Sequence, residues 1–128
     1  MVQWRKWVTM AGGMAALWTG VPASAHHSIA AYDREHPVTV IGTLKQFKFT
    51  NPHTWLILMV ADDNGAESEW DLVGNPGTVL VRQGWSRNTI RPGMKLKLLI
   101  APRRDGTGHG EWVQLLEIDG QRFAGPGR

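Results

Sequence analysis

Short strand-like segments separated by turn residues fill most of this chain, and this pattern constrains its fold more than any other feature. Residues 94–100 alternate between apolar side chains and lysines, which is typical of a strand with one buried face. Thr54–Ala61 contains the apolar run WLILMV and is expected to cross the centre of a sheet. Further strands are expected at 38–49, 67–73, 111–118 and, as a short closing strand, 121–123. Turn signals separate them: Asn51-Pro52-His53, Asp62-Asp63-Asn64-Gly65, Arg91-Pro92-Gly93 and Asp119-Gly120.

Two local patterns refine this prediction. In the segment 38–49 the apolar positions follow one parity as far as Leu44 and the other parity from Phe47, which predicts a β-bulge or bend. Asn75 is expected to cap a helix that has Pro76 at its first position and Gly84 just beyond its end. The sequence therefore predicts one short helix near residues 76–83.

The expected order of elements is three strands, one short helix and two strands. This order predicts an all-β fold with one short helix, a small five-stranded Greek-key barrel of the oligonucleotide/oligosaccharide-binding (OB) type, over residues 38–123. Another small barrel, or an open meander with one helix, fits the same pattern. Residues 26–37 are expected to form an extended N-terminal arm leading into this domain, and residues 124–128 a frayed tail.

Residues 1–25 have the order of a cleavable signal peptide. A basic end is followed by a largely apolar stretch, residues 8–18, and small residues at Ala23 and Ala25 match the A-x-A cleavage pattern. A membrane anchor is the alternative, but a span needs ~20 apolar residues, and this stretch is shorter and interrupted by glycines. We therefore predict cleavage after Ala25, export to the periplasm, and a mature protein without a membrane span.

Charge and cysteine content argue against several functions. The chain has 14 basic and 11 acidic residues, and loss of Arg5 and Lys6 with the signal peptide leaves twelve basic residues against eleven acidic ones. Without a basic excess, the mature protein lacks the main driving force for binding nucleic acid, so no nucleic-acid partner is expected. The absence of cysteine excludes disulfides, thiolate metal sites and cysteine nucleophiles.

Four motifs carry a family resemblance. They are Ala25-His26-His27-Ser28 after the signal peptide, Asn51-Pro52-His53-Thr54-Trp55, Arg82-Gln83-Gly84-Trp85 and Arg91-Pro92-Gly93. In these motifs the chain resembles a family of small exported bacterial proteins, the domain of unknown function 6152 family. The resemblance covers nearly the whole mature chain and implies a periplasmic, single-domain protein. It implies no activity.

The exported protein is expected to begin with a histidine, and this suits a copper site. The α-amine and ring Nδ1 of an N-terminal His26 can bind one metal ion, and a further histidine can supply a third nitrogen. Cleavage one or two residues earlier would leave a histidine at the third position, which binds Cu(II) or Ni(II) in a square plane with backbone amides. The candidate ligands of copper, or of another transition metal, are therefore His26, His27 and the loop histidines His53 and His109.

The loop histidines lie where an OB barrel usually binds its ligand. His53 falls in the loop between the first two expected strands and His109 in the loop before the fifth, and these loops flank the usual binding face. The arm is expected to enter at the far end, and the eleven residue-to-residue steps from His26 to Pro37 extend ~36 Å at most. In the alternative reading, His26 and His27 are only polar residues of a flexible arm, and His53 shapes its turn through a hydrogen bond to a backbone carbonyl.

The sequence does not favour an enzyme, because the serine of the A-H-H-S motif has no nucleophile-elbow context and the paired acids of the arm are typical of exposed turns. The alternative function is a non-metal OB-like module that binds a peptide, glycan or periplasmic partner protein on its barrel face. Asn51, Trp55 and Trp85 are candidate contacts there, with core packing as the alternative role of both tryptophans. Trp70 and Trp112 are expected in the core.

Overall fold

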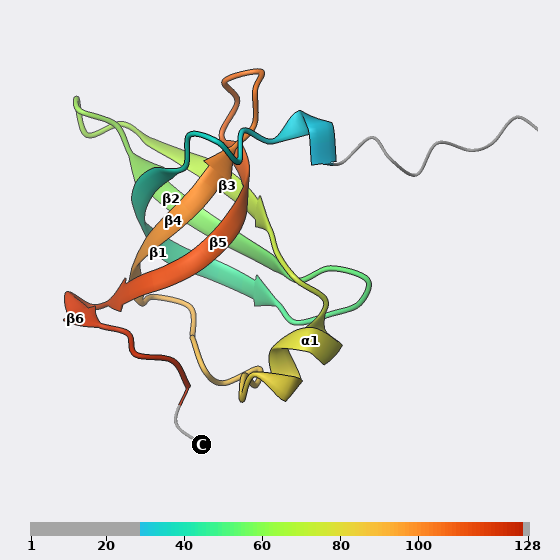
Figure 1. Ribbon diagram of the computed structural model, residues 1–128. Coiled ribbons are helices and arrows are strands. Elements are labelled where there is room, and N and C mark those ends of the chain that lie inside the picture. The colour runs from blue at the N-terminus through green and yellow to red at the C-terminus, as the bar shows by residue number, and fades with distance from the viewer. Residues whose placement is uncertain (1–28, 127–128) are drawn as a thin grey trace, which may run out of the picture.

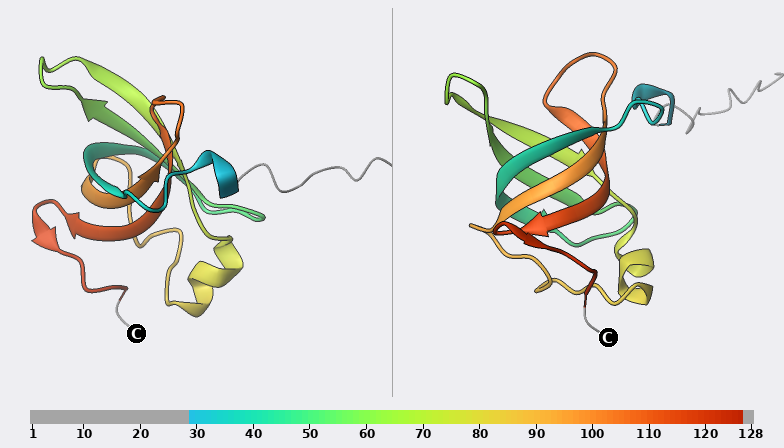
Figure 2. Two further views of the ribbon diagram at one scale, coloured as in Figure 1. Left: turned by 45° about the horizontal axis from the view of Figure 1, so that its top comes forward. Right: turned by 60° about the vertical axis from the view of Figure 1, so that its left-hand side comes forward.

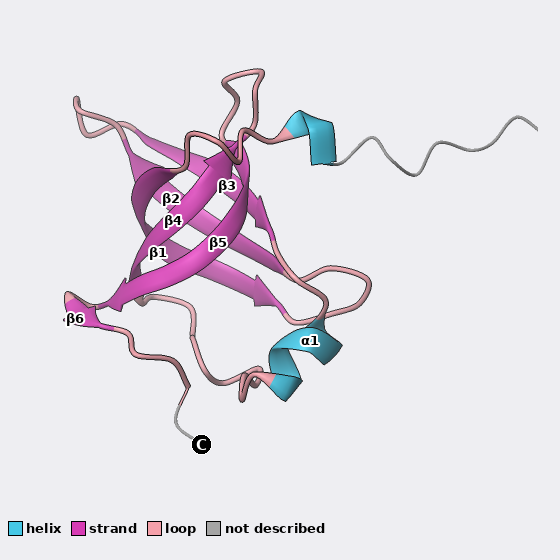
Figure 3. Cartoon of the chain, in the orientation of Figure 1, coloured by secondary structure: helices cyan, strands magenta, loops and turns pink. Residues whose placement is uncertain are grey.

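The computed structural model describes residues 29–126, so the predicted signal peptide, His26 and His27 lie outside the described residues (Figure 1). The described chain is mostly strand, with one short α-helix and one 3-10 helix (Figure 3). The elements in chain order are the 3-10 helix Ile29–Ala31, β1 Val38–Lys48, β2 Trp55–Ala61, β3 Glu67–Val73, α1 Gly77–Arg82, β4 Lys95–Pro102, β5 His109–Ile118 and β6 Gln121–Arg122.

Five of the strands close into a barrel, as the order of elements predicts. The strands are ordered β3-β2-β1-β4-β5-β6, and a parallel pairing of β3 with β5 joins the two ends of the five-stranded sheet. The remaining neighbours are antiparallel, and β6 is an extra strand at the end of β5. This is the OB-like barrel, and Figure 2 shows it from two sides with the β2–β3 hairpin projecting from it.

β1 is bent, which lets it belong to both halves of the barrel. Its first part, 38–43, pairs with β4, and its second part, 43–48, pairs with β2. The register with β2 shifts between Leu44 and Gln46, where the change of parity predicts a bulge. A side chain at Gly42 would place its Cβ 2.8 Å from the Met59 carbonyl oxygen, so glycine permits the close approach of β2 at this point.

Aliphatic side chains from all five strands fill the barrel. The residues without measurable exposure are Leu58, Leu72, Leu96, Leu98, Ile100, Ala101 and Thr54. Trp112 is buried and Trp70 half-buried, as expected. Trp85 packs at the α1 end of the barrel, with its ring centroid 5.6 Å from that of Trp112 and 5.4 Å from that of Phe123. Trp85 therefore takes part in core packing, the alternative role expected for it, and its side chain is half-buried.

The helix forms where it is expected, but its predicted cap is wrong. α1 begins at Gly77, Pro76 is its N-cap residue, and no N-cap side chain bonds to the helix. Instead, Asn51 of the β1–β2 loop caps it, because its Oδ1 accepts hydrogen bonds from the Thr78 amide at 3.2 Å and the Thr78 hydroxyl at 3.4 Å. The Asn75 carbonyl oxygen is bound by Thr54, which fixes the chain so that the extended backbone of Pro76 leads into the helix.

The arm docks on the barrel beside the β4–β5 loop, not at the far end from it. The Asp33 amide donates to the Pro102 carbonyl at 2.8 Å, and the Arg104 amide donates to the Ala31 carbonyl at 2.9 Å. The expectation fails because β1 and β4 are antiparallel with Val38 opposite Ile100, so β1 starts where β4 ends. Among residues 29–126, no helix is long and apolar enough to cross a membrane.

Replacing Asn51 should weaken the domain more than replacing Asn75. We expect Asn51→Ala to lower the free energy of unfolding by about 1 kcal/mol, because the first turn of α1 loses its capping acceptor. Asn75→Ala is the matched control and should change it by less than about 0.5 kcal/mol, because only its backbone is used. Urea unfolding of both variants measures the difference, and equal losses would contradict the assignment of Asn51 as the cap.

Candidate functional site

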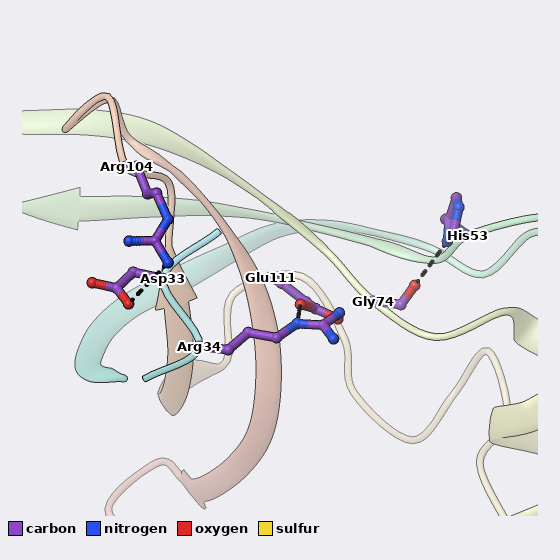
Figure 4. A network of polar contacts seen from close by, with 6 residues as sticks. All are labelled: Asp33, Arg34, His53, Gly74, Arg104 and Glu111. Carbon is purple, nitrogen blue, oxygen red and sulfur yellow. Dashed lines mark hydrogen bonds and ion pairs between the residues drawn. The ribbon is translucent and has the colours of Figure 1, made fainter. Parts of the chain in front are cut away.

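A cleft of about 380 Å³ lies where the arm, the β1–β2 loop and the β3–α1 junction meet. We call it the arm cleft. Its lining residues are Tyr32, Arg34, His53, Trp55, Val73, Gly74, Asn75, Pro76 and Glu111. The strand register brings these distant segments together, since Trp55 of β2 is opposite Val73 of β3, and Val73 is opposite Glu111 of β5. Figure 4 shows the Arg34–Glu111 pair and His53 with the Gly74 carbonyl.

His53 is exposed at the cleft and is oriented by the backbone of the β3–α1 junction. Its ring Nδ1 lies 3.4 Å from the Gly74 carbonyl oxygen, a long hydrogen bond. A carbonyl oxygen can only accept, so in this contact Nδ1 carries the proton, and in the neutral ring Nε2 then has the free lone pair. The hydrogen bond to a backbone carbonyl expected for His53 is therefore present, but its acceptor belongs to the β3–α1 junction and not to the turn of His53. In the neutral ring the same contact leaves the other nitrogen in the form that binds metal ions.

Hydrogen bonds from Thr50 and Thr54 hold the backbone on both sides of His53. The Thr50 hydroxyl donates to the His53 carbonyl at 2.9 Å. Thr54 is fully buried, and its hydroxyl and amide both donate to the Asn75 carbonyl, at 2.8 and 3.2 Å. The position of the imidazole thus follows from an ordered backbone, although the ring itself is exposed.

The opposite wall of the cleft is an ion pair between the arm and β5. Arg34 binds Glu111 through two parallel hydrogen bonds of 2.8 Å, from Nε to Oε2 and from Nη2 to Oε1. This bidentate geometry is specific in direction, although the pair is solvent-exposed and contributes little to stability. The two residues are 77 positions apart, and no local pattern in the sequence indicates that they pair.

Asp33 of the arm contacts the β4–β5 loop through Arg104. The hydrogen bond from His36 is the main cause that keeps the pKa of Asp33 below its ordinary value, and the charges of Arg104 and His36 act in the same direction against partial desolvation. The Arg104 guanidinium nitrogen lies 3.5 Å from Asp33 Oδ1. The ionised carboxylate therefore favours the docked arm.

The two loop histidines do not converge. His109 lies at the start of β5, where its Nδ1 is 3.8 Å from Asp71 Oδ2. Within residues 29–126, the only three metal-ligating side chains whose ligand atoms all lie within 4.8 Å of one another belong to Asp33, Glu35 and His36. Sequence reasoning treated Asp33 and Glu35 only as paired acids and overlooked His36, although its position three residues after Asp33 was the available signal.

The two candidate aromatic contacts, Trp55 and Trp85, line different hollows. Trp55 is 36% exposed and lines the arm cleft, so it remains a candidate for ligand contact. A larger hollow, of about 530 Å³, lies between β5, α1 and the C-terminal tail and includes Trp85 and Trp112. Among the described residues that line that hollow there is no histidine, aspartate or glutamate, so these residues offer no strong metal ligand.

The chain matches the model of a family of unknown function (DUF6152) over residues 15–112, and it belongs to that family. No curated protein matches the chain.

Acid should loosen the arm as Asp33 becomes protonated. We expect the Asp33 carboxyl carbon, followed by NMR, to titrate below the ordinary pKa of about 3.9, and His36→Ala to move its pKa toward that value. Because the pKa of Asp33 is lowered in the folded protein, chiefly by the hydrogen bond from His36, the contribution of Asp33 to stability is present above the ordinary pKa and lost as the pH falls through the lowered one.

Amide hydrogen exchange at Asp33 and Arg104 reports the docking itself. Both amides should exchange faster in His36→Ala, since they bond across the arm contact. His109→Ala is the matched control and should leave both the Asp33 titration and this exchange unchanged. If Asp33 titrates at its ordinary value in the unmodified protein, the assigned contact does not hold the arm.

Proposed function

We propose that this member of the family is an exported periplasmic binding domain that holds one Cu(II) ion at the arm cleft. In this proposal the α-amine and ring of His26 supply two nitrogens, after cleavage behind Ala25, and His53 supplies the third. The observation that carries it is the shared cleft, because Tyr32 of the arm lines the same hollow as His53. Six Cα-to-Cα steps lead from Tyr32 to His26 and span ~20 Å at most. The span is shorter than this because Ile29–Ala31 form a 3-10 helix, and the proposal requires that the remaining length bring His26 to His53.

The chemistry of His53 supports a role as ligand. Metal-bound histidines usually donate their other ring N–H to a carboxylate or backbone carbonyl, and the Nδ1 of His53 faces the Gly74 carbonyl. Imidazole and amine nitrogens suit copper, which also heads the affinity order of the divalent ions. The amine must lose its proton to bind, so copper affinity is expected to fall as the pH drops below ~7.7.

Glu111 does not compete for the ion, because Arg34 occupies both of its carboxylate oxygens. His27 follows His26 directly and is the alternative third ligand. His109 is a weaker candidate, since it lies beside Asp71 and does not line the arm cleft.

A non-metal ligand is the second candidate, favoured by the aromatic lining of the same cleft. Trp55 is partly exposed beside Tyr32, Val73 and Pro76, and such rings stack on flat or apolar groups. The site would then take a peptide, a glycan or a partner protein without the histidines, and Trp55→Ala would remove binding while His53→Ala would not.

The start of the exported protein decides whether a copper brace can form. We expect the intact mass of protein recovered from the periplasm to correspond to residues 26–128. A version that keeps one extra methionine before His26 should bind Cu(II) more weakly and give a different paramagnetic resonance spectrum, because the amine no longer belongs to the histidine. Equal affinity and spectrum in both versions would contradict the proposal.

Replacing His53 tests whether the site is shared between arm and barrel. In the protein that begins at His26, His53→Ala should weaken Cu(II) binding by at least about tenfold, through loss of one metal–nitrogen bond. His109→Ala is the matched control and should leave the affinity within about twofold. An unchanged affinity in His53→Ala would place the ion on the arm alone.

A further inference from the structure

The β1–β2 loop, α1 and the connection from α1 to β4 contain no aspartate or glutamate. In the described chain, no aspartate or glutamate occurs between His36 and Ala61, or between Leu72 and Met94. The second stretch contains three arginines, Arg82, Arg87 and Arg91. These stretches include the β1–β2 loop, α1 and the connection to β4, which lie together at one end of the barrel (Figure 1). The positive charges there have no nearby negative side chain along the chain.

A groove of about 400 Å³ runs between the β1–β2 loop and α1 at this end. We call it the helix groove. Its lining residues are Phe49, Thr50, Asn51, Gly77, Thr78, Val81, Arg82 and Arg87. Both arginines are exposed, and among residues 29–126 neither forms an ion pair.

The polar groups of the helix groove are mostly donors. The side-chain oxygen of Asn51 is used by Thr78, so the amide nitrogen of Asn51 is the part left to bind a ligand. Arg87 stands on a turn held by hydrogen bonds from the Ser86 amide to the Thr89 hydroxyl at 2.8 Å and from the Asn88 amide to the Ser86 hydroxyl at 3.2 Å. Guanidinium groups with amide donors match the oxygens of a planar or tetrahedral anion.

The apolar residues indicate what else the ligand carries. Val81 is 57% exposed in the same groove, and Phe49 lines it as well. Two positive charges without a carboxylate correspond to the charge of about −1.5 to −2 on a phosphate monoester at neutral pH. We infer that the helix groove binds a phosphate monoester with an apolar substituent, the phosphate between Arg82 and Arg87 and the substituent against Phe49 and Val81.

The helix groove is separate from the arm cleft, and phosphate binding there does not depend on copper. Asn51 is the link between them, because it caps α1 in the groove while its neighbour His53 lies in the cleft.

Phenyl phosphate is the probe, with inorganic phosphate for comparison, at low ionic strength and neutral pH. In nitrogen-labelled protein, we expect saturable shifts of the Thr78, Val81 and Arg82 amides, with phenyl phosphate binding more tightly than inorganic phosphate. Arg82→Gln and Arg87→Gln should each weaken binding by about tenfold, because each removes a charged hydrogen bond. Arg122→Gln removes one positive charge outside the groove and should change the affinity less than twofold.

Equal losses in all three variants would overturn the site, since they would show only general charge attraction. Tight binding of benzoate equal to that of phenyl phosphate would overturn the assignment to phosphate. Binding to phosphatidylglycerol vesicles without saturable binding of phenyl phosphate would replace the small ligand by a lipid surface. Thermal unfolding of the variants should match the unmodified protein, as expected for exposed side chains.

Discussion

Thr54 fixes the β1–β2 loop to the rest of the barrel, and both candidate sites depend on this contact. Its side chain is the one fully buried polar side chain among residues 29–126. The Thr54 hydroxyl and the Thr54 backbone amide both donate to the Asn75 carbonyl, and the Thr54 carbonyl accepts from the Gly74 amide. A buried hydroxyl would be costly without such a partner. Trp112 packs directly on Gly74, where any side chain would collide with its indole ring at 1.9 Å. The loop, the β3–α1 junction and the core are thereby joined into one connected unit.

The residues on either side of Thr54 in the chain have different roles. Asn51 is turned toward α1 and caps it, whereas His53 is turned toward the Gly74 carbonyl at the arm cleft. Trp55 begins β2 and lines the same cleft. Most residues of the N-P-H-x-W motif therefore have a structural role in the loop. The groups of the motif that remain for a ligand are Nε2 of His53 and the exposed part of Trp55. The scaffold is rigid enough to hold such groups in place before binding.

Sequence patterns predicted the barrel well because strand periodicity is local. The limits of β3 agree with the alternation between Glu67 and Val73, and the bulge in β1 lies where the parity of its apolar residues changes. The capping of α1 by Asn51 and the pairing of Arg34 with Glu111 join residues 27 and 77 positions apart, so neither has a local signal. The docking of the arm follows from the antiparallel pairing of β1 with β4, a consequence of the predicted topology that sequence reasoning did not draw.

The central claim of this account is that the ligand site of the domain is the arm cleft, where the N-terminal arm meets His53. Paramagnetic broadening of amide signals by substoichiometric Cu(II), in nitrogen-labelled protein that begins at His26, measures this most directly. The account predicts that the amides of Trp55, Gly74 and Asn75 lose intensity first, because they surround the His53 ring. Broadening confined to the arm, or centred on His109 and Asp71, would contradict it.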